Sequence, residues 1–274
     1  MKIRISKWYL DCVDESGNFF IGYTASLSFG FFPLHLVSRL TCIHGDVDQR
    51  TSSTWLRHTD PVETASALTW TCPKLHLKGT WMPLLAPISR NLFKNERGSV
   101  LWHCAQPLSE VDVAWNGIDT MRGFGYAERL ELTIVPGDIG LSRLRWGRFT
   151  APGISVIWIQ WSGRECRSVV LLNGNDMDQS MLSADSLVMG DNLCLRWSDS
   201  ASIRSGRLET SVLGASPVLK KVFPSWITNI HETKWRSRGR LFVGEQMKAE
   251  GWIIHETVDF DDPVHSRRGC GEVL

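Results

Sequence analysis

The sequence predicts an all-β protein whose strands form two packed barrels or sandwiches. Apolar residues alternate with polar or small residues in many short segments, which is the pattern of half-buried strands. Clusters of Gly, Asn, Asp, Ser and Pro separate many of these segments, as turns do. Helical periodicity is weak almost everywhere, and short helical turns are expected only at 64–68 and 217–223. The number of strands exceeds what one small barrel uses, which favours two such halves.

The first thirty residues predict a β-hairpin. Trp8, Leu10 and Cys12 alternate before a turn at 14–18, and apolar residues then occupy every odd position in 19–31. Further strands are expected at 66–71, 74–81, 99–105, 109–115, 124–135, 154–162, 166–172, 186–197, 202–213, 235–243 and 251–260.

The division between the two halves is expected at 116–120, a turn-forming stretch near the middle of the 274 residues. This gives an N-terminal β domain at 1–117 and a C-terminal β domain at 118–265. Residues 266–274 are polar and contain glycine, so they are expected to form a flexible tail. No convincing internal repeat is found in the sequence.

The balance of charge argues against a nucleic-acid partner. Lys plus Arg number 30 and Asp plus Glu number 29, so the protein has no net positive potential strong enough to attract a polyanion. The arginine-rich stretch 236–240 is short and is interpreted as a turn between strands. No run approaches the roughly 18 apolar residues of a membrane span, and the first residues carry no signal-peptide stretch. We therefore expect a cytoplasmic protein without stable membrane insertion, as a monomer or homodimer.

The cysteines and histidines predict no metal site. The seven Cys and eight His are scattered, without a Cys-x-x-Cys or His-x-x-x-His pattern. An odd number of Cys in a reducing compartment predicts free thiols. His103 and Cys104 are adjacent, but neighbouring side chains on a strand face opposite sides, so they are not expected to bind one ion. A Ser–His–Asp triad has no fixed order in sequence, and nothing in this sequence supports one.

Thirteen tryptophans indicate a wide apolar interior able to hold a hydrophobic small molecule. Trp146 and Arg148 share one face of a strand and could stack, while Gly147 between them allows a close approach. Most Trp residues are expected in the core, and only a few beside a ligand. The candidates for substrate binding are Trp8, Trp146, Arg148, Trp158 and Trp252.

Glu128 is the first candidate for catalysis. It shares a strand face with Tyr126, Leu130 and Leu132, where burial disfavours a charged carboxylate. A carboxyl group that keeps its proton near neutral pH is a general acid. The structural alternative is a buried ion pair with Arg145 or Arg148.

Glu256 repeats this pattern on a later strand, where it shares a face with Trp252, Ile254 and Val258. It is therefore a second candidate carboxyl group in the substrate site. The alternative is a partly exposed Glu on an edge strand, which is common for this residue type.

Two motifs resemble the carotenoid 1,2-hydratase (hydroxyneurosporene synthase) family. Residues 7–10, Lys-Trp-Tyr-Leu, followed by a turn with Gly17 and a Phe- and Gly-rich strand, resemble the opening of that family. Residues 125–128, Gly-Tyr-Ala-Glu, and 145–147, Arg-Trp-Gly, resemble its Gly-x-Tyr-x-Asp/Glu motif and downstream Trp-rich strand. Residues 129–131, Arg-Leu-Glu, stand where an Asn/Asp-Trp-Gly-like stretch is expected. Tocopherol cyclases and decalin-forming Diels–Alderases look like distant members.

The resemblance implies two tandem lipocalin-like β-barrels of calycin type, with a pocket at or near their junction. It implies that Glu128 protonates an alkene and that the rings of Tyr126, Trp146 and Trp158 shelter the resulting cation. Water then adds, or an internal nucleophile closes a ring, and no cofactor is needed. The expected function is thus a hydratase, cyclase or isomerase of a hydrophobic terpenoid or polyketide. The alternative is a non-catalytic lipocalin-type carrier of such a molecule.

Overall fold

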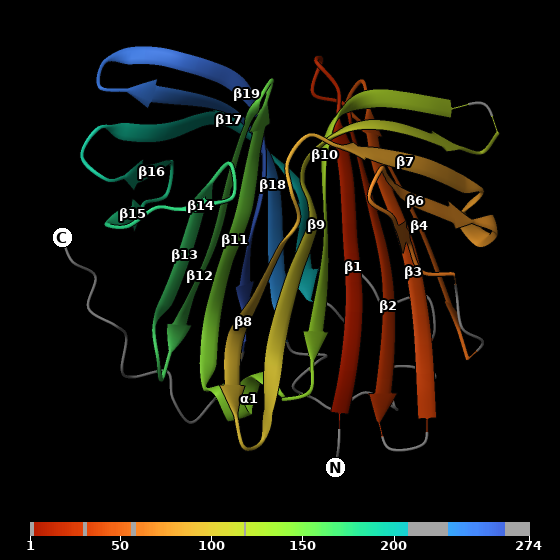
Figure 1. The fold of residues 1–274 in the computed structure, drawn as a ribbon. Helices are drawn as coiled ribbons and strands as arrows, with labels where there is room; N and C mark the ends of the chain where they lie inside the picture. Colours follow the sequence, from red (N-terminus) through yellow and green to blue (C-terminus); the bar gives the residue numbers. More distant parts are fainter. Residues whose placement is uncertain (1–2, 30–31, 56–58, 118, 208–229, 261–274) are drawn as a thin grey trace. The chain divides into compact units, whose positions relative to one another are not determined.

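The computed structural model describes residues 3–29, 32–55, 59–117, 119–207 and 230–260, and it confirms the all-β prediction (Figure 1). The chain divides into two compact units, Met1–Val135 and Pro136–Leu274. In the described residues, helical structure is limited to the four-residue helix α1 (Pro136–Ile139) and the 3-10 turn η1 (Pro73–Leu75). The helical turn predicted at 64–68 is wrong, because these residues form a bend before a strand. The one predicted at 217–223 lies outside the described residues.

Unit 1 is one antiparallel sheet in the order β4-β3-β2-β1-β10-β9-β7-β6-β5, with β8 paired to β9. The first strand, β1, pairs with the last, β10, over nine residues. The first and last strands of the unit therefore lie side by side in the middle of the sheet. The strands are β1 (Ile3–Val13), β2 (Phe19–Phe29), β3 (Phe32–Ile43), β4 (Asp46–Thr54), β5 (Val62–Glu63), β6 (Leu68–Cys72), β7 (Leu77–Pro83), β8 (Ile88–Asn95), β9 (Gly98–Trp115) and β10 (Asp119–Leu132).

Unit 2 has the same strand order, β14-β13-β12-β11-β19-β18-β17-β16-β15, except that none of its described strands corresponds to β8. Its first strand again pairs with its last. The sequence shows no such repeat, because the two halves have the same order of paired strands but different amino-acid sequences. The strands are β11 (Leu141–Ala151), β12 (Ile154–Gly163), β13 (Arg167–Leu172), β14 (Asn175–Asp176), β15 (Ser180–Leu182), β16 (Ser186–Met189), β17 (Leu193–Arg207), β18 (His231–Val243) and β19 (Gln246–Asp259).

The predicted division at 117/118 falls in the hairpin between β9 and β10, and both strands belong to unit 1. Residues 119–132 lie between β1 and β9 in the first sheet, so the contacts place the boundary after Val135 instead. The expected tail at 266–274 lies outside the described residues.

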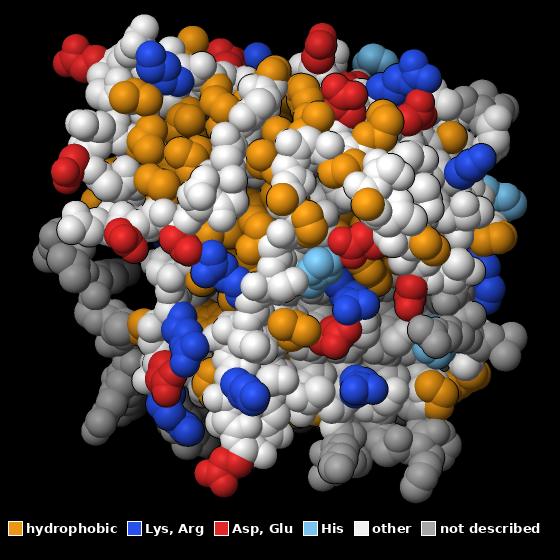
Figure 2. Space-filling view, viewed as in Figure 1, with side chains coloured by type: hydrophobic (Ala, Val, Ile, Leu, Met, Phe, Trp, Pro, Cys, Tyr) orange, Lys and Arg blue, Asp and Glu red, His pale blue; other side chains and the backbone are white. Residues whose placement is uncertain are grey.

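The arginine-rich stretch 236–240 is not a turn, because it lies in the middle of β18. Its charges are accommodated by cross-strand partners on β19. Arg238 Nε donates to Glu250 Oε1 at 2.6 Å, and both Arg236 and Arg238 lie over the ring of Trp252. On the face shown in Figure 2, cationic and anionic side chains are interspersed rather than gathered into a patch of one sign.

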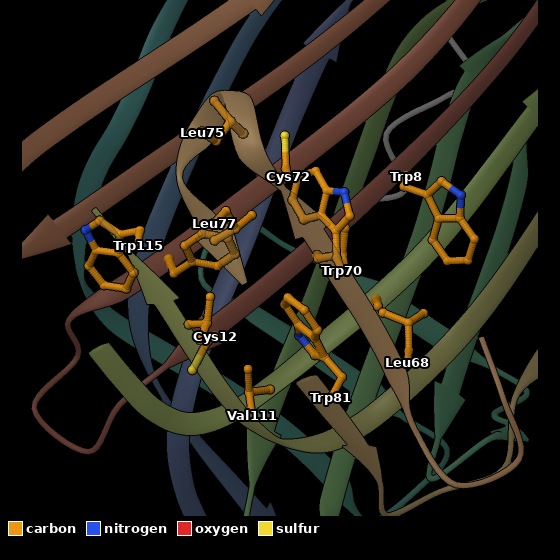
Figure 3. Packing of buried hydrophobic residues seen from close by; sticks show 14 of the residues in the cluster. Trp8, Cys12, Leu68, Trp70, Cys72, Leu75, Leu77, Trp81, Val111 and Trp115 are labelled. Carbon is orange, nitrogen blue, oxygen red and sulfur yellow. The ribbon is translucent and has the colours of Figure 1, made fainter. Parts of the chain in front are cut away.

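One face of the unit 1 sheet packs into a core rich in tryptophan (Figure 3). Trp8, Leu10 and Cys12 alternate on β1 toward this core face, as predicted. Buried apolar area of this kind stabilises a fold by roughly 25 cal/mol per Å². The cluster also contains Phe20, Val37, Leu68, Trp70, Cys72, Leu75, Leu77, Trp81, Ala105, Val111, Val113, Trp115, Met121 and Ala127.

Unit 2 has its own core, in which the rings of Trp158 and Trp197 stack at 5.5 Å with an angle of 9° between their planes. The close approach predicted at Gly147 is made by Trp158. A Cβ atom on Gly147 would lie 2.1 Å from Cζ2 of that ring. Many of the thirteen tryptophans are therefore core residues of the two units.

The described cysteines correct one prediction. Cys12, Cys42, Cys72, Cys104 and Cys194 keep their thiols outside any disulfide, whereas Cys166 is disulfide-bonded, so the prediction of free thiols is wrong there. Within the described ranges no group of three His, Cys, Asp or Glu side chains is arranged to hold a metal ion. Those ranges also contain no helix long and apolar enough to cross a membrane.

Candidate functional site

Glu128 lies in the middle of the unit 1 sheet, on the face opposite the core. The strand register places it between Tyr9 on β1 and Cys104 on β9. Its neighbour Ala127 points into the core, so alternation turns Glu128 away from it. The carboxyl group is half-buried.

Two buried donors converge on one oxygen of this carboxyl group. Tyr126 donates its hydroxyl proton to Glu128 Oε2 at 2.6 Å, and Trp102 donates Nε1–H to the same atom at 2.5 Å. The side chains of Tyr126 and Trp102 are at most 1% exposed. Strand alternation predicted that Tyr126 and Glu128 share a face, and the structure brings them together. Trp102 was not predicted as a neighbour, because it comes from a different strand.

A β-bulge in β9, opposite Gly125 to Glu128 of β10, shapes this site. The pairing of β10 with β9 shifts register between Gly125 and Glu128. The backbone N–H of Tyr126 donates to Asp11 Oδ1 at 3.0 Å, and Tyr9 donates its hydroxyl to Asp11 Oδ2 at 2.7 Å. Gly125 is required here, because a Cβ atom would lie 2.1 Å from the carbonyl oxygen of Asp11. Asp11 thus holds two tyrosines in place from β1.

Asp11 was missed by the sequence reading, although a signal was present. It is an acid inside the apolar stretch Leu10–Cys12, and its side chain is fully buried. A buried carboxylate needs hydrogen-bond donors, which points to partners on neighbouring strands.

Burial fixes the protonation of the groups beside Glu128. Burial, and then electrostatic interactions with Cys104 and Glu128, raise the pKa of Tyr126 well above its usual value of 10. Tyr126 therefore remains a neutral phenol and a lasting donor. Burial and Glu128 also raise the pKa of the Cys104 thiol well above 9. Cys104 therefore stays protonated and is not a nucleophile.

Glu128, Tyr126, Trp102, Tyr9 and Asp11 form one cluster, which we call the Glu128 cluster and which is rich in aromatic rings. The ring centroid of Tyr9 lies 6.1 Å from that of Tyr126 and 5.4 Å from that of Tyr23. Ring faces of this kind attract cations. The cluster thus combines the carboxyl groups of Glu128 and Asp11 with neutral donors and aromatic rings.

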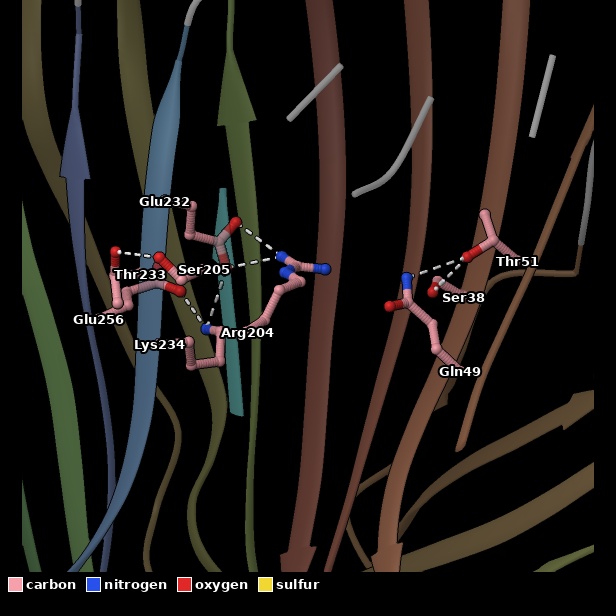
Figure 4. A network of polar contacts seen from close by, with 9 residues as sticks. All are labelled: Ser38, Gln49, Thr51, Arg204, Ser205, Glu232, Thr233, Lys234 and Glu256. Carbon is pink, nitrogen blue, oxygen red and sulfur yellow. Dashed lines mark hydrogen bonds and ion pairs between the residues drawn. The ribbon is translucent and has the colours of Figure 1, made fainter. Parts of the chain in front are cut away.

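Glu256 occupies a comparable place in unit 2 but has different partners (Figure 4). Its strand β19 lies between β11 and β18, so the edge-strand alternative is wrong. Lys234 donates to Glu256 Oε2, and its Nζ lies 3.8 Å from Glu232 Oε1 and 5.4 Å from the ring centroid of Trp146. Arg204 pairs with Glu232 at 2.6 Å. Glu256 is therefore part of a buried ionic network.

Arg145 and Arg148, the suggested ion-pair partners of Glu128, make hydrogen bonds within unit 2. Arg148 is fully buried and donates to Thr150 Oγ1 at 2.8 Å and to the carbonyl of Trp252 at 3.4 Å. Arg145 donates to the carbonyl oxygens of residues 182 and 183.

The predicted tryptophans lie in three different settings. Trp8 and Trp158 belong to the cores of unit 1 and unit 2. Trp8 is thus on the opposite face of β1 from Tyr9. Trp252 is half-buried beneath the guanidinium groups of Arg236 and Arg238, at 5.0 and 4.8 Å from its ring centroid. Trp146 packs beside Lys234, as described above.

Comparison with known proteins identifies the fold. No family model matches the chain, and no curated protein matches it in sequence. A protein named as an AttH candidate, from Nitrosomonas europaea, aligns with a TM-score of 0.56 over 93% of this chain and 92% of its own, at 9% identity. Kievitone hydratase from Nectria haematococca aligns with a TM-score of 0.53 over 93% and 89%, also at 9% identity. CghA aligns with a TM-score of 0.55 over 95% and 89%, at 9% identity.

These likenesses confirm the predicted fold class of two tandem lipocalin-like β units. At such identities they show the fold alone. The expected pocket at the junction of the units stays a prediction.

Proposed function

We propose that this protein is a cofactor-free hydratase, cyclase or isomerase of a hydrophobic small molecule, with Glu128 as the proton-transfer residue. The observation that carries the proposal is the pair of buried neutral donors, Tyr126 and Trp102, on one oxygen of Glu128. The proposal keeps the expectation of a cytoplasmic protein that binds no nucleic acid.

The geometry supports proton exchange at a fixed carboxyl group. Two donors on Oε2 fix the plane of the carboxyl group, so exchange with a substrate falls to Oε1. In the protonated state, Glu128 gives its proton to an alkene carbon and forms a C–H bond. The carbocation left on the adjacent carbon is attracted to the faces of nearby rings such as Tyr126 and Tyr9.

The second half of the reaction returns the proton. Water, or a nucleophile within the substrate, forms a bond to the cationic carbon and passes a proton to the Glu128 carboxylate. Hydration and ring closure then differ only in which nucleophile reaches the cation. Because Tyr126 keeps its proton, its hydroxyl stabilises the carboxylate formed during the cycle.

The similar structures agree with this class of function. Kievitone hydratase is named for a hydration reaction, and CghA has also been crystallised with the small molecule Sch210972. We propose that Trp146, Trp252 and Glu256 contribute to a ligand site within unit 2, whereas Arg148 is fully buried and bonded to Thr150.

The test begins with ligand discovery. Lipophilic polyenes and polyketides are titrated against tryptophan fluorescence, and binding is expected at micromolar concentrations, a typical range for small ligands. Bound compounds are then incubated with the wild-type protein and Glu128→Gln, and the products are analysed by mass spectrometry. Glu128→Gln should keep ligand affinity but lower turnover by roughly a hundredfold or more, the usual share of general acid catalysis.

The same variant separates the alternatives. A stable variant with full turnover would remove Glu128 from the mechanism. Binding without turnover in either protein would support a carrier. A large loss of thermal stability would assign Glu128 a structural role, because Tyr126 and Trp102 would exchange a carboxyl acceptor for an amide oxygen, which is a weaker acceptor than a carboxylate. Ser66→Ala, an exposed change in the same unit, is the matched control for both measurements.

A further inference from the structure

A second set of residues in unit 1 has the connectivity of a nucleophilic triad. Ser89 on β8 lies directly opposite His103 on β9. The Ser89 Oγ atom is 2.7 Å from His103 Nδ1. On the other side of the imidazole ring, His103 Nε2 is 2.9 Å from Glu63 Oε2 on β5. Serine, histidine and carboxylate therefore form one continuous chain of hydrogen bonds.

The Glu63 carboxylate determines which atom is the donor in each of these hydrogen bonds. A carboxylate only accepts, so His103 Nε2 must carry the proton and donate it to Glu63. In the neutral ring, Nδ1 then holds the lone pair and accepts from the hydroxyl of Ser89. This is the arrangement in which an imidazole acts as base toward a serine hydroxyl, although the two ring nitrogens exchange the roles they have in chymotrypsin-type triads.

The triad is separate from the Glu128 cluster. His103 lies between Trp102 and Cys104 on β9, and neighbouring side chains on a strand face opposite sides. His103 therefore faces away from Glu128.

Ser89 can also be reached from solvent. Ser89 and Glu63 are exposed, and the side chain of His103 is 20% exposed. By contrast, Ser237, which lies 2.9 Å from His255 Nε2 in unit 2, is fully buried and cannot meet a substrate.

We propose that Ser89 is the nucleophile of a second site that reacts with activated esters, with His103 as its base and Glu63 as the residue that orients the base. Ser89 Oγ forms a bond to the acyl carbon, and its proton passes to His103 Nδ1. The bond to the leaving alcohol breaks, and the alcohol takes that proton from Nδ1. Water then attacks the acyl-serine by the same route, which releases the acid and restores the serine.

The inference is tested with reagents that need no fitted pocket. The folded protein is treated with a fluorophosphonate, in which serine oxygen displaces fluoride from phosphorus, and the adduct is located by peptide mass spectrometry. A second assay follows p-nitrophenol release from p-nitrophenyl acetate, where an acyl-enzyme gives a burst of one equivalent. We expect the adduct on Ser89, and no adduct there in Ser89→Ala.

Variants of the partners and a matched control complete the test. His103→Gln should slow labelling by about a hundredfold or more, the usual share of a general base. Glu63→Gln should slow it less, because the base remains. Ser66→Ala removes another exposed serine hydroxyl of unit 1, one near Thr64 rather than a histidine, and should label like the wild type.

Three results would overturn the proposal. These are no adduct on the folded wild type, an adduct on a residue other than Ser89, or equal labelling in His103→Gln. Thermal melting of each variant ensures that a loss of labelling is not a loss of fold, which is not expected because Ser89 and Glu63 are exposed.

Discussion

At the scale of single residues, the carboxyl groups of Glu128 and Glu256 differ in their hydrogen-bond partners. Glu128 accepts from two neutral donors, whereas Glu256 is paired with the buried ammonium of Lys234. Removing the charge of one member of a buried ion pair leaves the other uncompensated, which typically costs several kcal/mol. Glu128 can therefore exchange a proton at a lower cost than Glu256. The sequence alone made the two positions look alike, because Lys234 lies on another strand.

His255 gives unit 2 a defined response to acid. Its imidazole stacks on Trp235 at 5.2 Å and lies 2.9 Å from the hydroxyl of Ser237. Burial, and then the positive charges of Lys234 and Arg145, lower the pKa of His255 from 6.5 to about 4. The folded state therefore favours the neutral ring, and this contribution to stability is complete above pH 6.5. It is lost as the pH falls from 6.5 toward 4.

We predict that His255→Gln flattens the dependence of stability on pH. Between pH 7 and pH 4.5 the wild type should lose about 2 to 3 kcal/mol more than the variant, at about 1.4 kcal/mol for each pKa unit. Urea unfolding of both proteins at the two pH values measures the difference, and other titrating groups cancel in the comparison. Equal losses in the two proteins would show that His255 does not control this response.

At the scale of strands, alternation predicted the two faces of β1 and β10 but not their partners across the sheet. Tyr126 and Glu128 are two residues apart, so one strand pattern joins them. Trp102 is 26 residues from Glu128, and Asp11 is 115 residues from Tyr126. Such contacts depend on strand order and register, which a single sequence does not contain. The bulge in β9, opposite Gly125 to Glu128, adds a local shift that alternation cannot show.

Strands without alternation were also missed. Strand β4, at Asp46–Thr54, is exposed or half-buried along its whole length and carries no apolar face. Its position at the edge of the sheet explains this pattern, because only its inner neighbour β3 pairs with it.

A test of packing within an element concerns Gly147 on β11. A Cβ atom there would lie 2.1 Å from Trp158 and 2.8 Å from the Cβ atom of His255. Trp158 is fixed by its stack on Trp197, so the new methyl group must displace a core ring. Gly147→Ala should therefore lower the free energy of unfolding by about 1 to 3 kcal/mol, as overpacking does.

The matched control is Gly137→Ala in α1. A Cβ atom on Gly137 meets nothing within 4 Å. This substitution also removes a flexible residue from the unfolded chain, so stability should be unchanged or slightly higher. Urea midpoints compare the two variants, and similar midpoints would show that Trp158 moves aside without a packing penalty.

At the scale of the whole molecule, the repeated topology explains why each half can be self-contained. In each unit the first strand pairs with the last, so each sheet is built only from strands of its own unit. The described core clusters also lie within one unit each. The number of strands predicted two halves. The boundary between them depends on whether β10 pairs with strands of the first half or of the second, and it pairs with β1 and β9 of the first.

We predict that the fragments 1–135 and 136–274 each fold when made separately. Every strand that the structure describes keeps its sheet neighbours in these fragments. Chains of this length can bury a sufficient core. Each fragment should give a far-UV circular dichroism spectrum typical of β-structure and should melt cooperatively.

The matched fragments 1–117 and 118–274 test the boundary that the sequence predicts. Cutting at 117/118 removes β10 from between β1 and β9, which opens the first sheet at its centre. Two strands that carry core residues such as Leu10 and Val111 would become unpaired edges, and such edges promote aggregation. We therefore expect fragment 1–117 to be insoluble or unfolded, while fragment 118–274 carries β10 as an extra segment without its partners. A soluble, cooperatively melting 1–117 beside an unfolded 1–135 would place the boundary at 117/118 and would contradict the division that the contacts indicate.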